Sequence, residues 1–563
     1  MKGRFLREIG AILAIVLAVA VIFSDYNRQR ITETEKGAPA LEVTQRVLLS
    51  RIKNARMPLV DIQRQMREAQ WLLEDIQKQK ETYSIEEAGG GKSIFTNKVD
   101  GYRVLVPEGM KADMSCSGVR AVLEKEDLKL EIYRQEIPDA EGSGIETYTN
   151  YSNRFLDNKA DHRRELEGKI DINGRTAYFL QWSRNALAKV ENDKCHYACV
   201  EVPLSEREVI TFLFKSSKPF ENKSYLDVVK SFETIDKTAQ PYTRKIRLTE
   251  NTGWDPQTAK AFEYYFGEEA PLRWGIFEAG APLDFTELKK IETRLDFTFP
   301  VLLYYTGILE NRDSHPDLAA ALAGAKKENR ILELTLQPAK QAPGKGNMVY
   351  DVLDGAYDAF LRNYAQTVAE FGEPVLFRLG NEMNGDWCVY SAYHTSKDTD
   401  IFKAFYRCVY RFFREAGADN VIWVWNPNGK SFPDFKWNHE LCYYPGDEYV
   451  DVVGMTSYNT GTYYEGEAWT EFAQMYNPLY ERYASLYEKP LMITEFSSSS
   501  VGGSKEAWVA DMFRDIVKYD RIKVAIWWDG CDWDAQGNIA RPYFIDETEE
   551  LVRIFRENLA HYK

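Results

Sequence analysis

The stretch PVLFRLGNEMNGDW, residues 374–387, decides the fold of the C-terminal half of this chain. A short apolar run ends there in a polar loop that carries one glutamate, Glu382. A second stretch, KPLMITEF at residues 489–496, also ends a short apolar run on a glutamate, Glu495. Short apolar runs bounded by turn residues are typical of buried strands in a parallel sheet. The two stretches therefore predict that each glutamate stands at the carboxyl end of a strand.

Residues 250–563 repeat the strand pattern eight times, with helical patterns between the runs. Eight βα units in one domain predict a (β/α)8 TIM barrel, in which catalytic groups lie at the carboxyl ends of the strands. Glu382 follows the fourth run, and Glu495 ends the seventh. The clearest helical patterns are 352–371 and 401–416. The eight runs are 273–277, 299–306, 331–337, 374–379, 421–425, 450–455, 490–494 and 523–528.

Two carboxylates at the rim of one barrel suit a particular chemistry. Retaining hydrolysis of a glycosidic bond needs two carboxyl groups about 5–5.5 Å apart, one protonated and one ionised. Taken alone, either glutamate could instead only pair with an arginine, and Arg378 is close to Glu382 in sequence. From these residues alone, the catalytic and the ion-pairing interpretations both stay open.

Several further runs, in the right order, resemble glycoside hydrolase family 26, a (β/α)8 family of the retaining clan A whose best-known activity is β-mannanase. The resemblance covers about the last 290 residues. It implies that Glu382 is the general acid/base and Glu495 the nucleophile, with Arg378 and the Tyr458 hydroxyl supporting the nucleophile, and that Trp387 and Trp528 present ring faces to sugars. The matching positions are Arg378, Glu382–Gly385, Trp387, Asn428, 444–447, 452–454, Tyr458, 495–496 and 527–528.

Two positions depart from the family pattern. The family usually has His before the acid/base, where this chain has Asn381, and Asp two residues before Tyr458, where this chain has Thr456. In much of the wider clan an Asn at this position contacts the sugar 2-hydroxyl, which the resemblance extends to Asn381. A β-glucan, a xylan or an exopolysaccharide therefore stands beside mannan as a candidate substrate.

The composition excludes other classes of function. The net charge is −15 and no long Lys/Arg run occurs, which argues against nucleic acid as a partner. Seven Cys and six His lack any disulfide or metal-ligand spacing, so we expect no metal and no cofactor. The Cys195 and Cys199 side chains are expected to be small buried groups.

The N-terminus carries an export pattern. Lys2, Arg4 and Arg7 precede an apolar run at residues 9–23. This pattern is typical of a signal sequence, and cleavage after Ala20 would leave an apolar new terminus, which favours an uncleaved anchor. We expect residues 1–30 to be a transmembrane signal anchor with the bulk of the protein outside the cell membrane. The alternative is a secreted protein with this segment removed.

Two segments separate this anchor from the barrel. Residues 31–92 predict a helical stalk, or a docked amphipathic helix, followed by a linker at Gly89–Gly91. Residues 93–238 predict an α+β sandwich domain, with a hairpin turn at Asn173–Gly174. The order of its elements weakly resembles a PsbP-like domain. It shows no catalytic constellation, so a spacer or binding module with an unknown protein partner is expected.

The sequence as a whole predicts a retaining endo-β-glycosidase that acts on a polysaccharide near the cell surface. The alternative is a catalytically weak carbohydrate-binding or exopolysaccharide-assembly protein that keeps the same barrel. A transglycosylase using the same residues is a third interpretation. Substitution of Glu495 separates the glycosidase and the transglycosylase from the carbohydrate-binding protein, because only the two enzymes need this carboxylate for catalysis.

Overall fold

The computed structural model describes residues 59–138, 143–249, 253–310, 312–339 and 344–563. The chain divides into two units, Met1–Ile76 and Gln77–Lys563. The expected anchor and the first part of the stalk lie outside the described residues. In the described part of the chain, no helix has both the length and the apolar character that a membrane crossing requires. The helical interpretation of the stalk is confirmed for α3, which runs from Leu59 to Thr82.

The glycine run after α3 is a turn and not the expected linker. Strand β1 (Tyr83–Gly89) pairs antiparallel with β2 (Lys92–Asn97). Gly90 and Gly91 between them have φ values of +63° and +71°. Glycine adopts this left-handed backbone without steric cost, so three glycines close a hairpin as readily as they make a linker. The sheet structure therefore begins near residue 83, ten residues before the predicted boundary.

Two antiparallel sheets form the α+β region. A four-stranded sheet has the order β1-β2-β3-β11, and a seven-stranded sheet has the order β4-β5-β6-β10-β9-β8-β7. The predicted hairpin is confirmed, with Ile172 paired to Arg175 across Asn173–Gly174. The remaining elements are β3 (Tyr102–Pro107), β4 (Lys111–Asp113), β5 (Ala121–Lys125), β6 (Leu128–Glu136), α4 (Ile145–Ser152), β7 (Arg163–Ile172), β8 (Arg175–Ser183), β9 (His196–Pro203), β10 (Glu208–Ser216), α5 (Tyr225–Lys230) and β11 (Glu233–Thr234).

The seven-stranded sheet is buried on both faces, as β10 shows. Ile210, Phe212 and Phe214 belong to the core between the two sheets. Val209 and Leu213, on the other face, belong to the cluster that contains the barrel's outer core. Since side chains alternate between the faces of a strand, one strand serves two cores. The α+β region is therefore packed against the barrel, and its expected role as a spacer or binding module stays a prediction.

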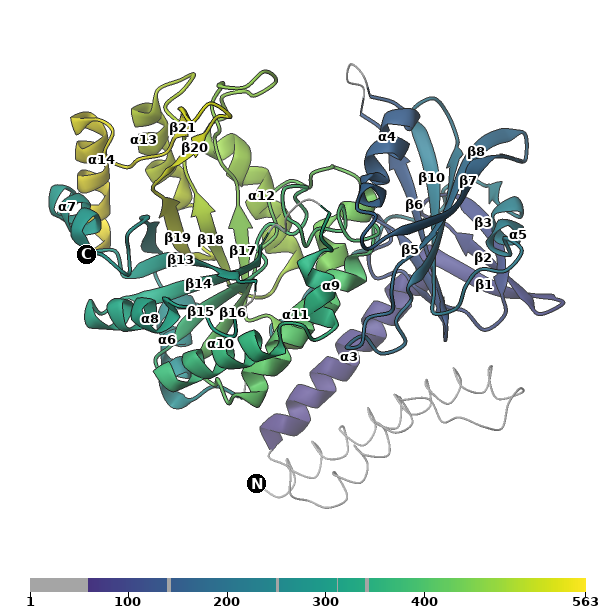
Figure 1. Cartoon of the computed structure of the whole chain (residues 1–563), viewed down its shortest axis with the longest axis horizontal. Coiled ribbons are helices and arrows are strands. Elements are labelled where there is room, and N and C mark those ends of the chain that lie inside the picture. The colour runs from purple at the N-terminus through teal and green to yellow at the C-terminus, as the bar shows by residue number, and fades with distance from the viewer. Residues whose placement is uncertain (1–58, 139–142, 250–252, 311, 340–343) are drawn as a thin grey trace, which may run out of the picture. The chain divides into compact units, whose positions relative to one another are not determined.

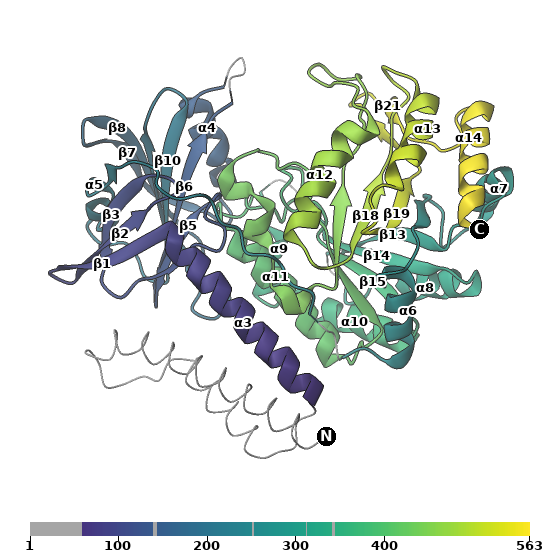
Figure 2. The same ribbon diagram turned by 180° about the vertical axis from the view of Figure 1, so that it is seen from behind.

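The C-terminal region is a closed barrel of eight strands in sequential order, β12 to β19, with helices outside it (Figures 1 and 2). The predicted TIM barrel is confirmed. Its strands are β12 (Arg273–Phe277), β13 (Val301–Ile308), β14 (Ile331–Pro338), β15 (Val375–Leu379), β16 (Val421–Trp425), β17 (Val452–Thr456), β18 (Leu491–Phe496) and β19 (Ile522–Trp528). Its helices are α6 (Pro256–Phe266), α7 (Thr286–Leu295), α8 (Leu318–Lys327), α9 (Met348–Leu353), α10 (Asp358–Phe371), α11 (Thr399–Glu415), α12 (Phe472–Leu486), α13 (Lys505–Ile516) and α14 (Glu549–Leu559).

One detail of the barrel differs from the sequence prediction. The helical pattern at 352–371 is two helices, α9 and α10, separated near Gly355, whose φ is +93°. This difference concerns packing around the barrel and leaves the strand order unchanged.

Candidate active site

Alternation along the strands determines which side chains enter the barrel. Val301 and Leu303 on β13 and Leu376 on β15 form part of the inner core, whereas Val375 and Phe377 face the helices. Continuing this period of two toward the carboxyl ends brings further side chains to the inner face. These are Phe277, Tyr305, Glu333, Thr335, Gln337, Arg378 and Trp528.

Glu495 reaches the inner face through an irregularity in β18. Met492 faces inward, while Ile493 and Phe496 face the helices. The pairing with β17 moves from Met455–Ile493 to Thr456–Glu495, so one extra residue lies in β18. An extra residue in one strand reverses the direction of the next side chain. This bulge turns Glu495 toward the site, where regular alternation would have turned it away.

Two fixed donors hold the Glu495 carboxylate, which is 5% exposed. Arg378 Nη2 donates to Glu495 Oε2 at 2.8 Å, and the Tyr305 hydroxyl donates to the same oxygen. Burial and the Glu495 charge raise the pKa of Tyr305 well above its usual value, so this hydroxyl keeps its proton. Tyr305 thus supplies a hydroxyl contact that the sequence did not predict, and the supporting role of Tyr458 stays a prediction.

Arg378 is itself fixed on every side of its guanidinium. Its Nε lies 2.8 Å from Thr335 Oγ1 and 2.8 Å from Glu333 Oε1, and its Nη1 donates to Asn426 Oδ1 at 3.0 Å. Glu333 is fully buried, and burial raises its pKa to about 8 although Arg378 opposes that shift. The arginine is therefore held between two carboxyl groups, and it cannot turn away from Glu495 without leaving Glu333 unpaired in the core.

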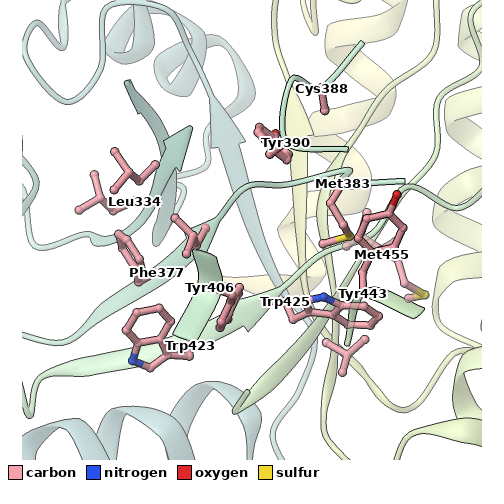
Figure 3. Packing of buried hydrophobic residues seen from close by; sticks show 14 of the residues in the cluster. Leu334, Phe377, Met383, Cys388, Tyr390, Tyr406, Trp423, Trp425, Tyr443 and Met455 are labelled. Atoms are coloured by element: carbon pink, nitrogen blue, oxygen red, sulfur yellow. The ribbon is translucent and has the colours of Figure 1, made fainter. Parts of the chain in front are cut away.

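The loop after β15 places Glu382. Glu382 has a φ of +55°, a left-handed conformation that is uncommon outside glycine, and its N–H donates to Asn426 O at 2.7 Å. Asn384 is fully buried and accepts from Asn428 N at 2.8 Å, which joins this loop to the loop after β16. Met383 lies in the same buried cluster as Met455 and Tyr443 (Figure 3). These contacts fix the strained backbone that points Glu382 into the site.

The surroundings of Glu382 favour its protonated form. Its pKa is raised to about 8, mainly by burial and next by the negative charge of Glu495. Trp387 Nε1 donates to Glu382 Oε2 at 3.1 Å and, with Arg378, partly opposes this shift. The site therefore holds one carboxyl group with a raised pKa beside a second carboxyl group paired with an arginine, which are the opposed environments that an acid/base and a nucleophile need.

The other predicted residues lie around this pair. Asn381 is 3% exposed, and its Oδ1 accepts from Gln337 Nε2 at 2.5 Å. Trp528 stacks on Phe277 at 5.1 Å, so one of its ring faces is covered. Tyr458 contacts the edge of the Trp528 ring at 6.3 Å, and burial raises its pKa well above the usual value. Trp387 is 51% exposed and is the more open of the two tryptophans.

Metal ligands do not gather in the part of the chain that the structure describes. Among those residues, no group of three or more His, Cys, Asp or Glu side chains is placed to hold a metal ion. Cys195 and Cys199 are both buried and unbridged.

Four contacts at the site were not predicted from the sequence, namely those of Tyr305, Glu333, Gln337 and Asn426. Tyr305, Glu333 and Gln337 follow from strand alternation, since all three are an even number of residues from inward-facing Val301 or Ile331. Asn426 comes directly after β16, two residues beyond inward-facing Val424. The alternation signal was present in the sequence, but its phase was fixed only by the closed barrel.

The comparisons with known proteins support a glycoside hydrolase. Residues 342–489 match the family described as glycosyl hydrolase family 26, a range that includes Glu382 and ends before Glu495. The resemblance of the C-terminal barrel to glycosyl hydrolase family 26 is thereby confirmed.

Three relatives carry different names. Endoglucanase H of Acetivibrio thermocellus is 32% identical over 211 residues, which are 37% of this chain and 22% of that protein. A mannan endo-1,4-beta-mannosidase of Bacillus subtilis is 37% identical over 97 residues, 16% of this chain and 25% of that protein. The beta-1,3-xylanase TXYA of a Vibrio species is 28% identical over 260 residues, 42% of this chain and 53% of that protein. The chain thus spans less than two thirds of the length of each.

Proposed function

We propose that this protein is a retaining endo-β-glycosidase that cleaves a β-linked polysaccharide by double displacement. Glu495 attacks the anomeric carbon while Glu382 protonates the leaving oxygen, and Glu382 then deprotonates the water that releases the sugar. The observation that carries the proposal is the pair of opposed environments, a carboxyl group with a raised pKa beside a carboxylate bound to Arg378 and Tyr305.

The contacts also assign the attacking atom. Among the hydrogen bonds of the described residues, Tyr305 and Arg378 both donate to Glu495 Oε2. Oε1 is then the oxygen with a free lone pair for the anomeric carbon. Two donors on the other oxygen disperse the negative charge and ease departure of the carboxylate in the second step.

The relatives support a β-linked polymer as the substrate. Their names specify a glucanase, a mannosidase and a β-1,3-xylanase, of which two are endo-acting by name. Asn381 and Thr456 replace the His and Asp of the family pattern, so a β-glucan, a xylan or an exopolysaccharide stands beside mannan as a candidate substrate.

Glu495→Gln tests the proposal. The full chain and the variant are incubated with mannan, mixed-linkage β-glucan, 1,3- and 1,4-linked xylan and an exopolysaccharide, and new reducing ends are measured. We expect the natural chain to cleave at least one polymer and the variant to lose roughly 10⁴-fold or more of that activity. Full activity in the variant contradicts the proposal, as does polymer binding by the natural chain without release of reducing ends.

We propose in addition that the enzyme is held at the cell surface by residues 1–30. The charged residues Lys2, Arg4 and Arg7 before the apolar run at 9–23 support this location. Detection of the intact N-terminus in the membrane fraction is the expected result, and recovery of a cleaved, soluble form alone contradicts it.

A further inference from the structure

The α+β region is fixed to the barrel beside the loop between β15 and α11, which carries Glu382 and is called the acid/base loop here. Lys215 on β10 is fully buried and donates to Asp398 Oδ1, at the start of α11, at 2.6 Å. Tyr197 on β9 donates to Asp398 Oδ2 at 2.9 Å. Opening this contact would separate the buried Asp398 carboxylate from its lysine, so the contact resists opening. Asp398 ends the long loop that follows β15 and carries Glu382.

Helix α4 of the same region packs on the loop after β16. The Tyr148 ring meets Phe435 edge-on at 4.6 Å, and Ser152 Oγ accepts from Trp437 Nε1 at 3.1 Å. Tyr148 and Ser152 are each 1% exposed and are used for packing. Tyr151 and Arg154 lie beyond this contact, with Tyr151 half-buried and Arg154 exposed.

Tyr151 connects α4 to the acid/base loop. Its hydroxyl donates to the carboxylate of Asp386, the residue before Trp387. Its ring lies 5.0 Å from that of Tyr393, and the Arg154 guanidinium lies 5.5 Å from its centre. Tyr151, Arg154 and Tyr393 therefore form one patch, which Asp386 joins to Trp387.

The patch continues toward the site through exposed aromatic rings. Trp387 is 51% exposed, lies 5.3 Å from Phe432, which is 41% exposed, and donates to Glu382. Exposed aromatic rings with charged neighbours suit sugars, because ring faces contact sugar C–H groups while Arg and Asp bond the hydroxyls. The general acid protonates the oxygen of the leaving group, so the sugars that leave lie on the Glu382 side.

We propose that Tyr151 of α4 and Arg154, which begins the 3-10 turn η1 (Arg154–Asp157) just after that helix, bind with Tyr393 the leaving-group portion of a β-linked glycan, beyond the sugar that contacts Trp387. This assignment rests on the proposed function, because it takes Glu382 as the acid. It gives the α+β region a direct part in substrate selection. Loss of the patch weakens binding of long chains and leaves the bond-breaking groups in place.

Kinetics on substrates with large and small leaving groups test the proposal. Full-length Tyr151→Ala, Arg154→Ala and the double variant are compared on oligosaccharides of three to six sugars and on a 4-nitrophenyl glycoside from the series that the natural chain cleaves. We expect KM for the longer oligosaccharides to rise about 3- to 10-fold per variant, while kcat/KM on the aryl glycoside changes less than about 2-fold. Tyr151→Phe keeps the ring and removes the hydroxyl, so it separates the contributions of the two groups to KM.

Arg103→Ala is the matched control. Arg103 is an exposed arginine on β3, in the sheet that lies on the far side of the sandwich core, and it pairs with Glu233. We expect Arg103→Ala to leave both KM for the oligosaccharides and kcat/KM for the aryl glycoside unchanged. Equal losses on both substrate classes would show that Tyr151 and Arg154 only support the loop, and no change on either would also overturn the proposal.

Direct binding separates this proposal from the proposed function. If the natural chain cleaves nothing, gluco-, manno- and xylo-oligosaccharides of six sugars are titrated into it and into the double variant by calorimetry. Binding that weakens in the double variant supports the patch while the catalytic proposal fails. Binding that is absent, or equal in the two proteins, overturns the patch as well.

Discussion

The surroundings of Glu495 and of Glu382 are built in opposite ways. Glu495 stands on a strand, 5% exposed, with Arg378 and Tyr305 fixed on one oxygen. Glu382 stands on a loop in a left-handed conformation, with the Trp387 indole as donor to its carboxyl group. Fixed donors stabilise the Glu495 carboxylate, whereas burial and the neighbouring negative charge favour the protonated form of Glu382. We therefore expect substitutions around Glu495 and around Glu382 to change the activity in different ways.

The largest effect that separates the two carboxyl groups concerns leaving groups. In Glu382→Gln, kcat/KM on polymers should fall by about 10²–10⁴-fold because the leaving oxygen is no longer protonated. On an activated aryl glycoside, whose leaving group needs no proton, the loss should be less than about 10-fold. Initial-rate kinetics on both substrates measure this, and Glu495→Gln is the contrast, because it should lose both activities alike. Equal losses in Glu382→Gln would remove the distinction between the two roles.

A smaller effect is expected at the nucleophile's hydroxyl donor. Tyr305→Phe keeps the ring and removes one of the two hydrogen bonds to Glu495 Oε2. A hydrogen bond to a charged group contributes about 1.5–3 kcal/mol, so kcat/KM should fall roughly 10- to 100-fold. Tyr458→Phe is the matched control and should cost less than Tyr305→Phe. The reverse order would return the supporting role to Tyr458.

The pH profile tests the surroundings of Glu382. The proposed mechanism needs Glu382 protonated, and the pKa of this group is about 8, so kcat/KM should decline as the pH rises through about 8. The Trp387 indole favours the ionised form of Glu382, so Trp387→Phe should raise the pKa of Glu382 and move the descending limb of the pH profile to higher pH. Phe432→Leu, which alters the neighbouring ring only, should leave the limb in place. A limb that stays fixed in Trp387→Phe would show that the indole does not act on the acid.

The smallest expected effect is on stability. The folded pKa of Glu382, about 8, lies above its ordinary value of 4.5, so its protonation stabilises the fold fully below about 4.5 and this contribution is lost as the pH rises through 8. The Gln side chain in Glu382→Gln does not ionise, so the variant does not lose this stability as the pH rises. The melting temperature of the variant relative to the natural chain should therefore be higher at pH 8.5 than at pH 5, by roughly 2–4 °C. An equal difference at both pH values would mean that Glu382 ionises normally.

Much of the barrel and half of the site could be predicted from residues alone. The strand runs that precede Glu382 and Glu495 appear as local patterns, because a strand buried on both faces must be apolar along its length. The linker at Gly89–Gly91 was wrong for a local reason, since glycines permit both a linker and a hairpin turn. The Tyr305 contact was missed because it joins strands that are 190 residues apart in the chain.

The sequence by itself determined the eight strands, their order, and the two glutamates, of which Glu382 follows the fourth run and Glu495 ends the seventh. The tertiary structure decided how those glutamates are oriented and held. It placed a bulge in β18 that turns Glu495 inward, and it brought Tyr305 and Glu333 to the same arginine. It also packed α4 against the acid/base loop through Tyr151 and Asp386. Apolar patterns report burial locally, whereas hydrogen bonds between distant strands exist only once the barrel has closed.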